Sequence, residues 1–219
     1  MVRLPFASGY PAVSEEGVLF VGSTDSTMNA IRVSDGARLW TVKPGHMPFD
    51  MVTLTSDEVL FGTHESIIVA LDRKTGATRW KRSYPGMSRS MISVGRANIL
   101  YLAGPGRLSA VDGTSGRELW ARTDGQVAWP PTVAADGKIL VSFIAFPSYQ
   151  VHAIDGATGT TIWKWIDHRL TGVLLPRTPG RAFVFGDWSV SALRVDLPGL
   201  ADSPWPMLQR DPARTSRAP

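Results

Sequence analysis

The sequence predicts an all-β protein, a β-propeller with about five four-stranded blades, and three observations carry this prediction. A motif of Ala, Gly and Trp recurs four times, two apolar runs separated by a turn precede each copy, and no segment shows sustained helical periodicity. Four short strands repeating at about 40 to 45 residues are typical of propellers, in which each repeat forms one small sheet.

The recurring motif keeps its internal spacing in every copy. The four copies are Ala30, Gly36 and Trp40; Ala70, Gly76 and Trp80; Ala110, Gly116 and Trp120; and Ala153, Gly159 and Trp163. Successive tryptophans lie 40, 40 and 43 residues apart. A fifth hairpin, GRAFVFGDWSVSAL at 180–193, ends on Ala192, but Pro198 and Asp202 occupy the places of the glycine and the tryptophan.

Each unit is predicted to hold four strands, which the second unit places near 51–55, 59–63, 67–73 and 77–83. The predicted blades span about 10–43, 50–84, 90–123, 131–166 and 172–209. They form a single propeller domain over 1–200, followed at 201–219 by a closing strand and a basic tail.

The motif residues are expected to have a structural role rather than a catalytic one. The glycine supplies the positive φ that the turn between the last two strands requires. Asp72, Asp112 and Asp155, each with a Thr or Ser three residues later, can bond the turn backbone, whereas Arg32 takes this place in the first copy. We expect the tryptophan to dock on the neighbouring blade, in a gap that the small alanine leaves.

Composition excludes several classes of function. The sequence contains no run of 18 apolar residues, the length that a membrane-spanning helix needs. It also contains no cysteine, which excludes disulfides, zinc–thiolate sites and thiol nucleophiles. The first residues lack the apolar stretch of an intact signal peptide. The net charge of +4 is small and scattered apart from the tail, which is expected to be a solvated terminus, so no nucleic-acid partner is predicted.

The pattern A-x-D-x-x-x-G-x-x-x-W resembles the tryptophan-docking motif of pyrroloquinoline quinone (PQQ) repeat propellers. The stretches VALDRKTGATRW, SAVDGTSGRELW and HAIDGATGTTIW match it closely. The ending SPWPMLQRDPARTSR also resembles a terminal segment W-P-M-F-x-x-D-x-x-x-T-G of some bacterial and archaeal members, from which Leu208 and Ser216 depart. The resemblance implies a propeller of PQQ-like repeats and, through the family, a periplasmic or secreted location, with a cytoplasmic one left open.

The family includes quinoprotein dehydrogenases, outer-membrane assembly scaffold lipoproteins and sensor domains of bacterial kinases. The dehydrogenases typically carry a calcium site with a catalytic Asp and often a vicinal disulfide. No stretch of this sequence offers a match for those residues, so we predict no catalytic residue and no metal site. No cofactor is firmly implied, and PQQ with calcium belongs only to the dehydrogenase alternative.

Ring closure is left open by the repeat count. This family usually builds seven or eight blades, whereas five-bladed propellers also exist. A missing N-terminal stretch would explain both the small count and the absent signal peptide, and we expect an incomplete or divergent ring. A strand near 205–208 is expected to complete the last blade or to seal the ring.

One face of the propeller is the predicted recognition surface, because the connections between blades and the turns between the second and third strands meet there. It gathers aromatic, histidine and arginine side chains, namely His46, Phe49, His64, Tyr84, Arg89, Trp129, Phe146, His168 and Trp188. Ordinary loop composition is the alternative. The histidines lack metal-ligand spacing, and His152 is expected to be a strand residue.

Three functions remain open from the sequence. The first is a non-catalytic binding or scaffolding propeller that holds a protein or a small ligand on one face, as part of an exported bacterial protein. The second is a fragment or divergent relative of a PQQ-dependent dehydrogenase. The third is the sensor domain of a larger receptor or kinase. The sequence favours the first, because the docking motifs are intact and catalytic residues are not found.

Overall fold

The computed structural model describes residues 7–87, 91–146, 148–167, 170–186 and 189–203. These residues form twenty β-strands and one turn of 3₁₀ helix, Arg96–Asn98. The all-β prediction is therefore confirmed.

The first two sheets each contain four antiparallel strands in chain order. The first consists of β1 (Ala7–Val13), β2 (Val18–Ser23), β3 (Met28–Arg32) and β4 (Arg38–Val42). The second consists of β5 (Phe49–Leu54), β6 (Glu58–Gly62), β7 (Ile67–Asp72) and β8 (Thr78–Ser83). One parallel pair, Tyr10 with Met51, joins β1 to β5, so the two sheets meet along their first strands.

The next two sheets repeat this plan with one variation. The third contains β9 (Met91–Val94), β10 (Ile99–Gly104), β11 (Arg107–Asp112) and β12 (Glu118–Arg122). In the fourth, the first strand is split into β13 (Gln126–Val127) and β14 (Thr132–Val133), and both pieces pair with β15 (Lys138–Ala145). β16 (Ser148–Asp155) and β17 (Thr161–Asp167) complete it.

The fifth sheet has three strands among the described residues. These are β18 (Leu170–Leu174), β19 (Arg181–Gly186) and β20 (Val190–Arg194). The chain after β20 turns toward the third and fourth sheets. Leu200 donates its N–H to the carbonyl of Pro176 (2.9 Å) and Ala201 to that of Val133 (2.8 Å). The strand expected near 205–208 lies outside the described residues.

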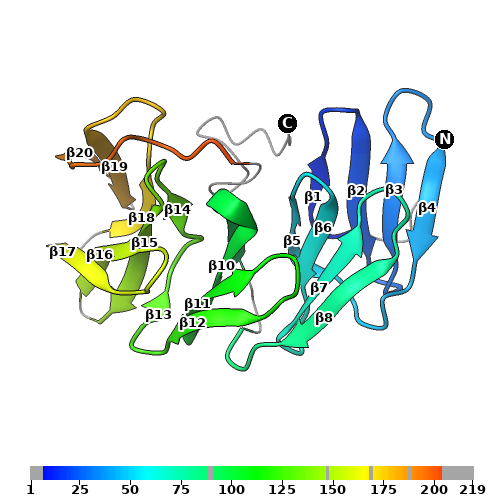
Figure 1. Cartoon of the computed structure of the whole chain (residues 1–219), viewed down its shortest axis with the longest axis horizontal. Helices are drawn as coiled ribbons and strands as arrows, with labels where there is room; N and C mark the ends of the chain where they lie inside the picture. Colours follow the sequence, from blue (N-terminus) through cyan, green and yellow to red (C-terminus); the bar gives the residue numbers. More distant parts are fainter. Residues whose placement is uncertain (1–6, 88–90, 147, 168–169, 187–188, 204–219) are drawn as a thin grey trace.

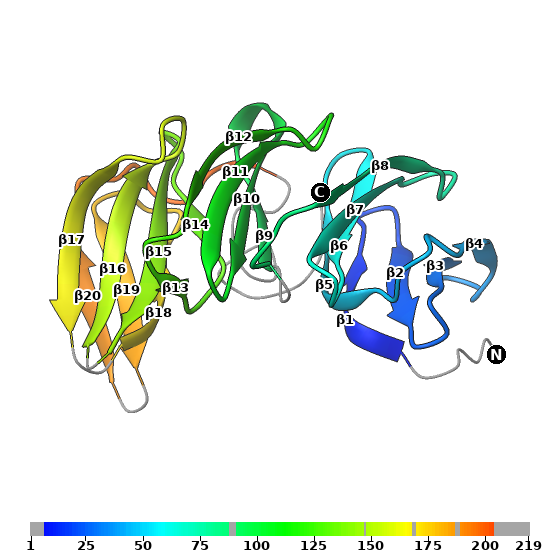
Figure 2. The same ribbon diagram turned by 90° about the horizontal axis from the view of Figure 1, so that it is seen from below.

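The five sheets follow one another along an open arc (Figure 1). β2–β4 lie at one end of the arc and β18–β20 at the other, and Figure 2 shows the same separation from a second direction. Each sheet is therefore a blade, and neighbouring blades pack face to face.

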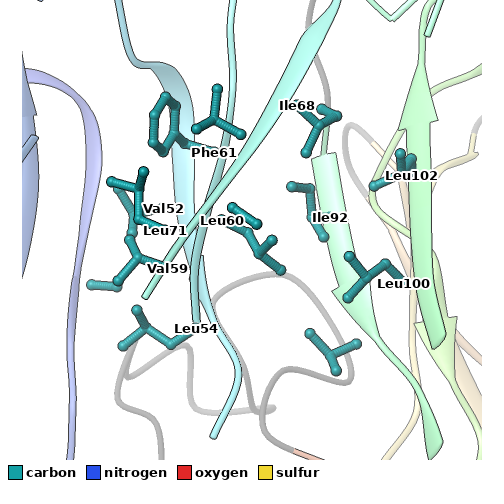
Figure 3. Close-up of a cluster of buried hydrophobic side chains, with 14 of the residues drawn as sticks. Val52, Leu54, Val59, Leu60, Phe61, Ile68, Leu71, Ile92, Leu100 and Leu102 are labelled. Atoms are coloured by element: carbon teal, nitrogen blue, oxygen red, sulfur yellow. The ribbon is translucent and has the colours of Figure 1, made fainter. Parts of the chain in front are cut away.

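The interior blades are buried on both faces, which explains their unbroken apolar runs. All five residues of β6 are buried. Figure 3 shows Val59, Phe61 and Leu71 on the side of the second blade toward the first, with Leu60 and Ile68 on the side toward Ile92, Leu100 and Leu102 of the third. Burial of these side chains between sheets supplies the main favourable term for stacking the blades.

Candidate functional site

The repeated tryptophan of each blade lies on the turn of the next blade. The indole Nε1 groups donate to backbone carbonyls there: Trp40 to Arg73 (3.1 Å), Trp80 to Gly113 (2.7 Å) and Trp120 to Gly156 (2.9 Å). A Cβ built on the motif glycine of that next blade would come within 2.9 Å of Trp40 at Gly76, 2.6 Å of Trp80 at Gly116 and 2.8 Å of Trp120 at Gly159.

The gap that receives each indole is therefore made by the glycine of the next blade, and the expectation that the alanine makes it is wrong. The alanine instead pairs with the tryptophan of its own blade across neighbouring strands, as Ala70 does with Trp80. All four motif alanines are 0% exposed. The glycine has a second role in the turn, where a positive φ was predicted. Its φ is 69 to 75° in all four copies.

The turn carboxylates behave as predicted. Asp72 accepts from the backbone N–H and the hydroxyl of Thr75 (both 2.9 Å). The corresponding pairs are Asp112 with Ser115 and Asp155 with Thr158. In the first copy Asp35 accepts from the N–H of Ala37 and from Arg32 (both 2.9 Å). Backbone and side-chain donors from Ser115 hold the pKa of Asp112 below its usual range, so these groups stay ionised and structural.

Sequence reasoning missed further blade-to-blade bonds. Tyr84, predicted on the recognition face, is only 4% exposed, and its hydroxyl donates to the carbonyl of Gly116 (2.5 Å) in the next blade. Arg122 donates to the carbonyl of Gly159 (3.0 Å). Arg82 reaches Ser115 in the same way (3.3 Å). The sequence signal for the two arginine bonds is a basic residue two positions after the motif tryptophan, as at Arg82 and Arg122.

The recognition face has one compact cluster, between the first and second blades. The rings of Phe49 and His64 stack with centroids 3.5 Å apart. His46 Nδ1 lies 3.8 Å from Glu65 Oε2, and the Glu65 side chain is 56% exposed. The hydroxyl of Thr63, followed by the backbone N–H and the nearby histidines, lowers the pKa of Glu65. An aromatic platform beside a carboxylate can hold an apolar or cationic group of a partner.

A second group of aromatic residues lies on the fourth and fifth blades. Trp129 packs edge-on against Phe185 with ring centroids 6.0 Å apart. Phe146 is 95% exposed at the turn after β15. Arg89, His168 and Trp188 were also predicted on this face, but they lie outside the described residues.

Metal ligands are not clustered among the described residues. No group of three His, Asp or Glu side chains in this part of the chain could hold a metal ion. His152 lies within β16 at 4% exposure, with its Nε2 2.9 Å from Gln150 Oε1. Burial lowers its pKa to about 4, so this ring is neutral at pH 7. None of the described helices is long and apolar enough to cross a membrane.

Comparison with known proteins gives the family. The model described as outer membrane protein assembly factor BamB matches residues 4–164 and again 64–190. The chain belongs to this family of PQQ-like repeat propellers. The BamB of Burkholderia pseudomallei is 27% identical over 198 residues, covering 81% of this chain and 50% of the relative. The match confirms the predicted resemblance.

Dehydrogenases of the same repeat type are also similar to the chain. A quinoprotein ethanol dehydrogenase of Pseudomonas aeruginosa is 27% identical over 117 residues, 49% of this chain and 19% of the relative. A 1-butanol dehydrogenase (quinone) of Thauera butanivorans is 29% identical over 124 residues, 52% of this chain and 19% of the relative. The chain thus spans half or less of the length of these curated relatives.

Solved structures show the same fold. BamB from Moraxella catarrhalis superposes with a TM-score of 0.56 at 18% identity, covering 90% of this chain and 76% of that one. Quinohemoprotein alcohol dehydrogenase from Comamonas testosteroni gives 0.59 at 16% identity, covering 88% and 45%. The fold-class prediction, a β-propeller of PQQ-like repeats, is confirmed.

Proposed function

We propose that the chain is a non-catalytic, protein-binding propeller that takes part in outer membrane protein assembly. The observation that carries the proposal is the extent of similarity: the assembly factor of Burkholderia pseudomallei aligns with 81% of this chain, whereas the dehydrogenases align with about half. The geometry supports it, because the recurring Ala–Gly–Trp spacing is used for contacts between blades, which leaves the loop clusters free of that role and open to a partner.

The proposed partner surface is the loop face, with the Phe49–His64 cluster and Phe146 as contact points. Exposed aromatic rings on loops held by rigid sheets are typical of protein recognition. Assembly at an outer membrane would place the protein outside the cytoplasm. None of the relatives described above is named as a sensor or kinase, so the sensor-domain alternative has no supporting observation.

A photo-cross-linker placed at Phe49 of the chain expressed in a bacterium that has an outer membrane would test this function. We expect an adduct that mass spectrometry identifies as a subunit of the outer-membrane assembly machinery. The same cross-linker at Thr114, on a turn between third and fourth strands, is the matched control and should give no such adduct. Adducts at both positions, or at neither, would contradict the proposal.

The dehydrogenase alternative rests on relatives that share about half of this chain. It is tested by reconstituting the purified protein with PQQ and calcium and assaying dye-linked alcohol oxidation. We expect no oxidation above that of the free cofactor. Turnover that depends on the protein would replace the scaffold function with the enzymatic one.

A further inference from the structure

The fifth blade leaves a place for a fourth strand beside β20. In each of the first four blades, the strand equivalent to β20 pairs on its outer side with a strand that sets tryptophan opposite alanine. These pairs are Ala30 with Trp40, Ala70 with Trp80, Ala110 with Trp120 and Ala153 with Trp163. The corresponding residue of β20 is Ala192, which is exposed, whereas the other four alanines are fully buried.

The segment that should fill this place is used elsewhere. By the spacing of the first copy, where 38–42 follow Ala30, residues 200–204 would form the fourth strand. Leu200 and Ala201 instead bond to carbonyls of Pro176 and Val133, and the Ser203 hydroxyl donates to the carbonyl of Val94 (2.6 Å) in β9. These bonds hold the segment against the third, fourth and fifth blades, and none of them goes to β20.

The backbone of β20 presents hydrogen-bonding groups on the side away from β19. Gly186 donates to the carbonyl of Ser189 and Val195 donates to the carbonyl of Gly180, so residues 189 and 195 bond toward β19. Because these directions alternate along an antiparallel strand, the N–H and C=O groups of Val190, Ala192 and Arg194 point outward. No strand of the described chain pairs with that side.

The side chains on one face of this edge define what fits it. Val190 is 72% exposed and pairs with Phe185, and Ala192 pairs with Phe183. Arg194 pairs with Arg181, and both are exposed. An antiparallel strand would therefore meet, in its own direction, a cationic pair, then a small residue beside an aromatic ring, then an apolar position.

We propose that the outer edge of β20 binds an extended segment of a partner protein as a fourth strand. The segment carries an acidic residue opposite Arg194, an aromatic residue opposite Ala192 and an aliphatic residue opposite Val190. In the four complete blades, the fourth strand likewise sets an aromatic residue, tryptophan, opposite the alanine of the third strand. The inference deepens the proposed function. It rests on that function in one respect, that the partner is a protein.

Binding of a fluorescein-labelled peptide, TETWTVT, measured by fluorescence anisotropy, tests the proposal. We expect saturable binding that weakens at least about tenfold in Ala192→Pro, since proline removes one outward N–H and its ring hinders pairing. That N–H is not used by the β19–β20 ladder, so the variant should fold. Ala192→Ser, which keeps the N–H, should bind as the parent does.

A matched edge control uses Lys81, an exposed residue of the outer strand β8. Tyr84 donates to the carbonyl of Ser66, so alternate residues of β8 bond inward and the Lys81 N–H points outward. Lys81→Pro should leave peptide binding unchanged. A peptide with Ala in place of Trp should bind the parent protein at least about tenfold more weakly, because the ring would lose its apolar contact.

Hydrogen exchange on the parent protein supplies a test that needs no variant. The peptide should slow exchange of the amides of Val190, Ala192 and Arg194 but not those of Ser191 and Leu193, which already bond within the sheet. Failure of the peptide to bind, or equal binding by Ala192→Pro, would overturn the proposal. Slow exchange of these amides before the peptide is added would also overturn it, because another segment would then occupy the edge. A dimer that Ala192→Pro dissociates would do the same, because a second copy of the chain would then be the occupant. The cross-linking test at Phe49 is independent of all these outcomes.

Discussion

Glu58, at the start of β6, is a carboxylate buried without adequate partners. It is 1% exposed, and neither side-chain oxygen has a hydrogen-bond partner among the described residues, although Arg79 Nη1 lies 3.7 Å from Oε1. Burial, with the nearby charge of Asp57, raises its pKa from 4.5 to about 7. The folded protein therefore holds this proton more tightly than the unfolded chain does.

Replacing Glu58 should change how stability depends on pH. Because the folded-state pKa is raised, the stabilising effect of the neutral form is complete below pH 4.5 and is lost as pH rises through about 7. Glu58→Gln should flatten this decline and raise the free energy of unfolding near pH 8 by about 1–3 kcal/mol. Urea unfolding at several pH values between 4.5 and 8 measures this free energy, and Glu15→Gln, at an exposed position, is the control. An unchanged pH dependence would contradict the assignment.

At the scale of elements, the joint between blades depends on close contact of an indole with a glycine. Trp80 is 8% exposed and packs on Gly116, whose turn is held by Asp112. Three bonds from the second blade reach the turn of the third: those from Trp80, Arg82 and Tyr84. The joint is thus a set of contacts between one outer strand and the next turn.

Gly116→Ala should therefore be far more harmful than the same change at an open turn. Both Gly116 (φ 69°) and Gly137 (φ 87°) have positive φ, which costs an alanine about 1–2 kcal/mol. A Cβ on Gly116 also meets Trp80 at 2.6 Å, whereas nothing lies within 4 Å of one on Gly137. We expect Gly116→Ala to lose at least about 1–3 kcal/mol more than Gly137→Ala in chemical denaturation. Equal losses of unfolding free energy in the two variants would contradict the conclusion that the motif glycine makes room for the indole.

At the scale of the whole molecule, the blades form an arc rather than a closed ring. Figure 1 places the first and fifth blades at opposite ends, and Ser203, the last residue that the structure describes, bonds to Val94 of the third blade. This leaves the β20 edge exposed, and exposed edges are sites at which other chains pair.

The open arc should be measurable in solution. A compact domain of 219 residues would have a radius of gyration of about 17 Å. Because the blades spread along an arc, we expect small-angle X-ray scattering to give a larger value for a monomer of 23.8 kDa. A value near 17 Å, or a dimer by light scattering, would contradict this shape.

The sequence by itself determined the repeat, the strands and the turns. The apolar runs and the place of each glycine are local properties, so the second blade could be predicted to within two residues of β5–β8. The Asp–Thr and Asp–Ser turn bonds were equally predictable, because both partners lie three residues apart.

Only the tertiary structure decided which groups meet between blades. Trp80 and its carbonyl partner are 33 residues apart, so no local pattern shows that glycine rather than alanine receives the indole. The same holds for Tyr84, whose burial depends on the turn of the next blade, and for Ser203, which contacts a strand 109 residues earlier. These contacts depend on how successive sheets stack, and that stacking also left the edge of β20 exposed.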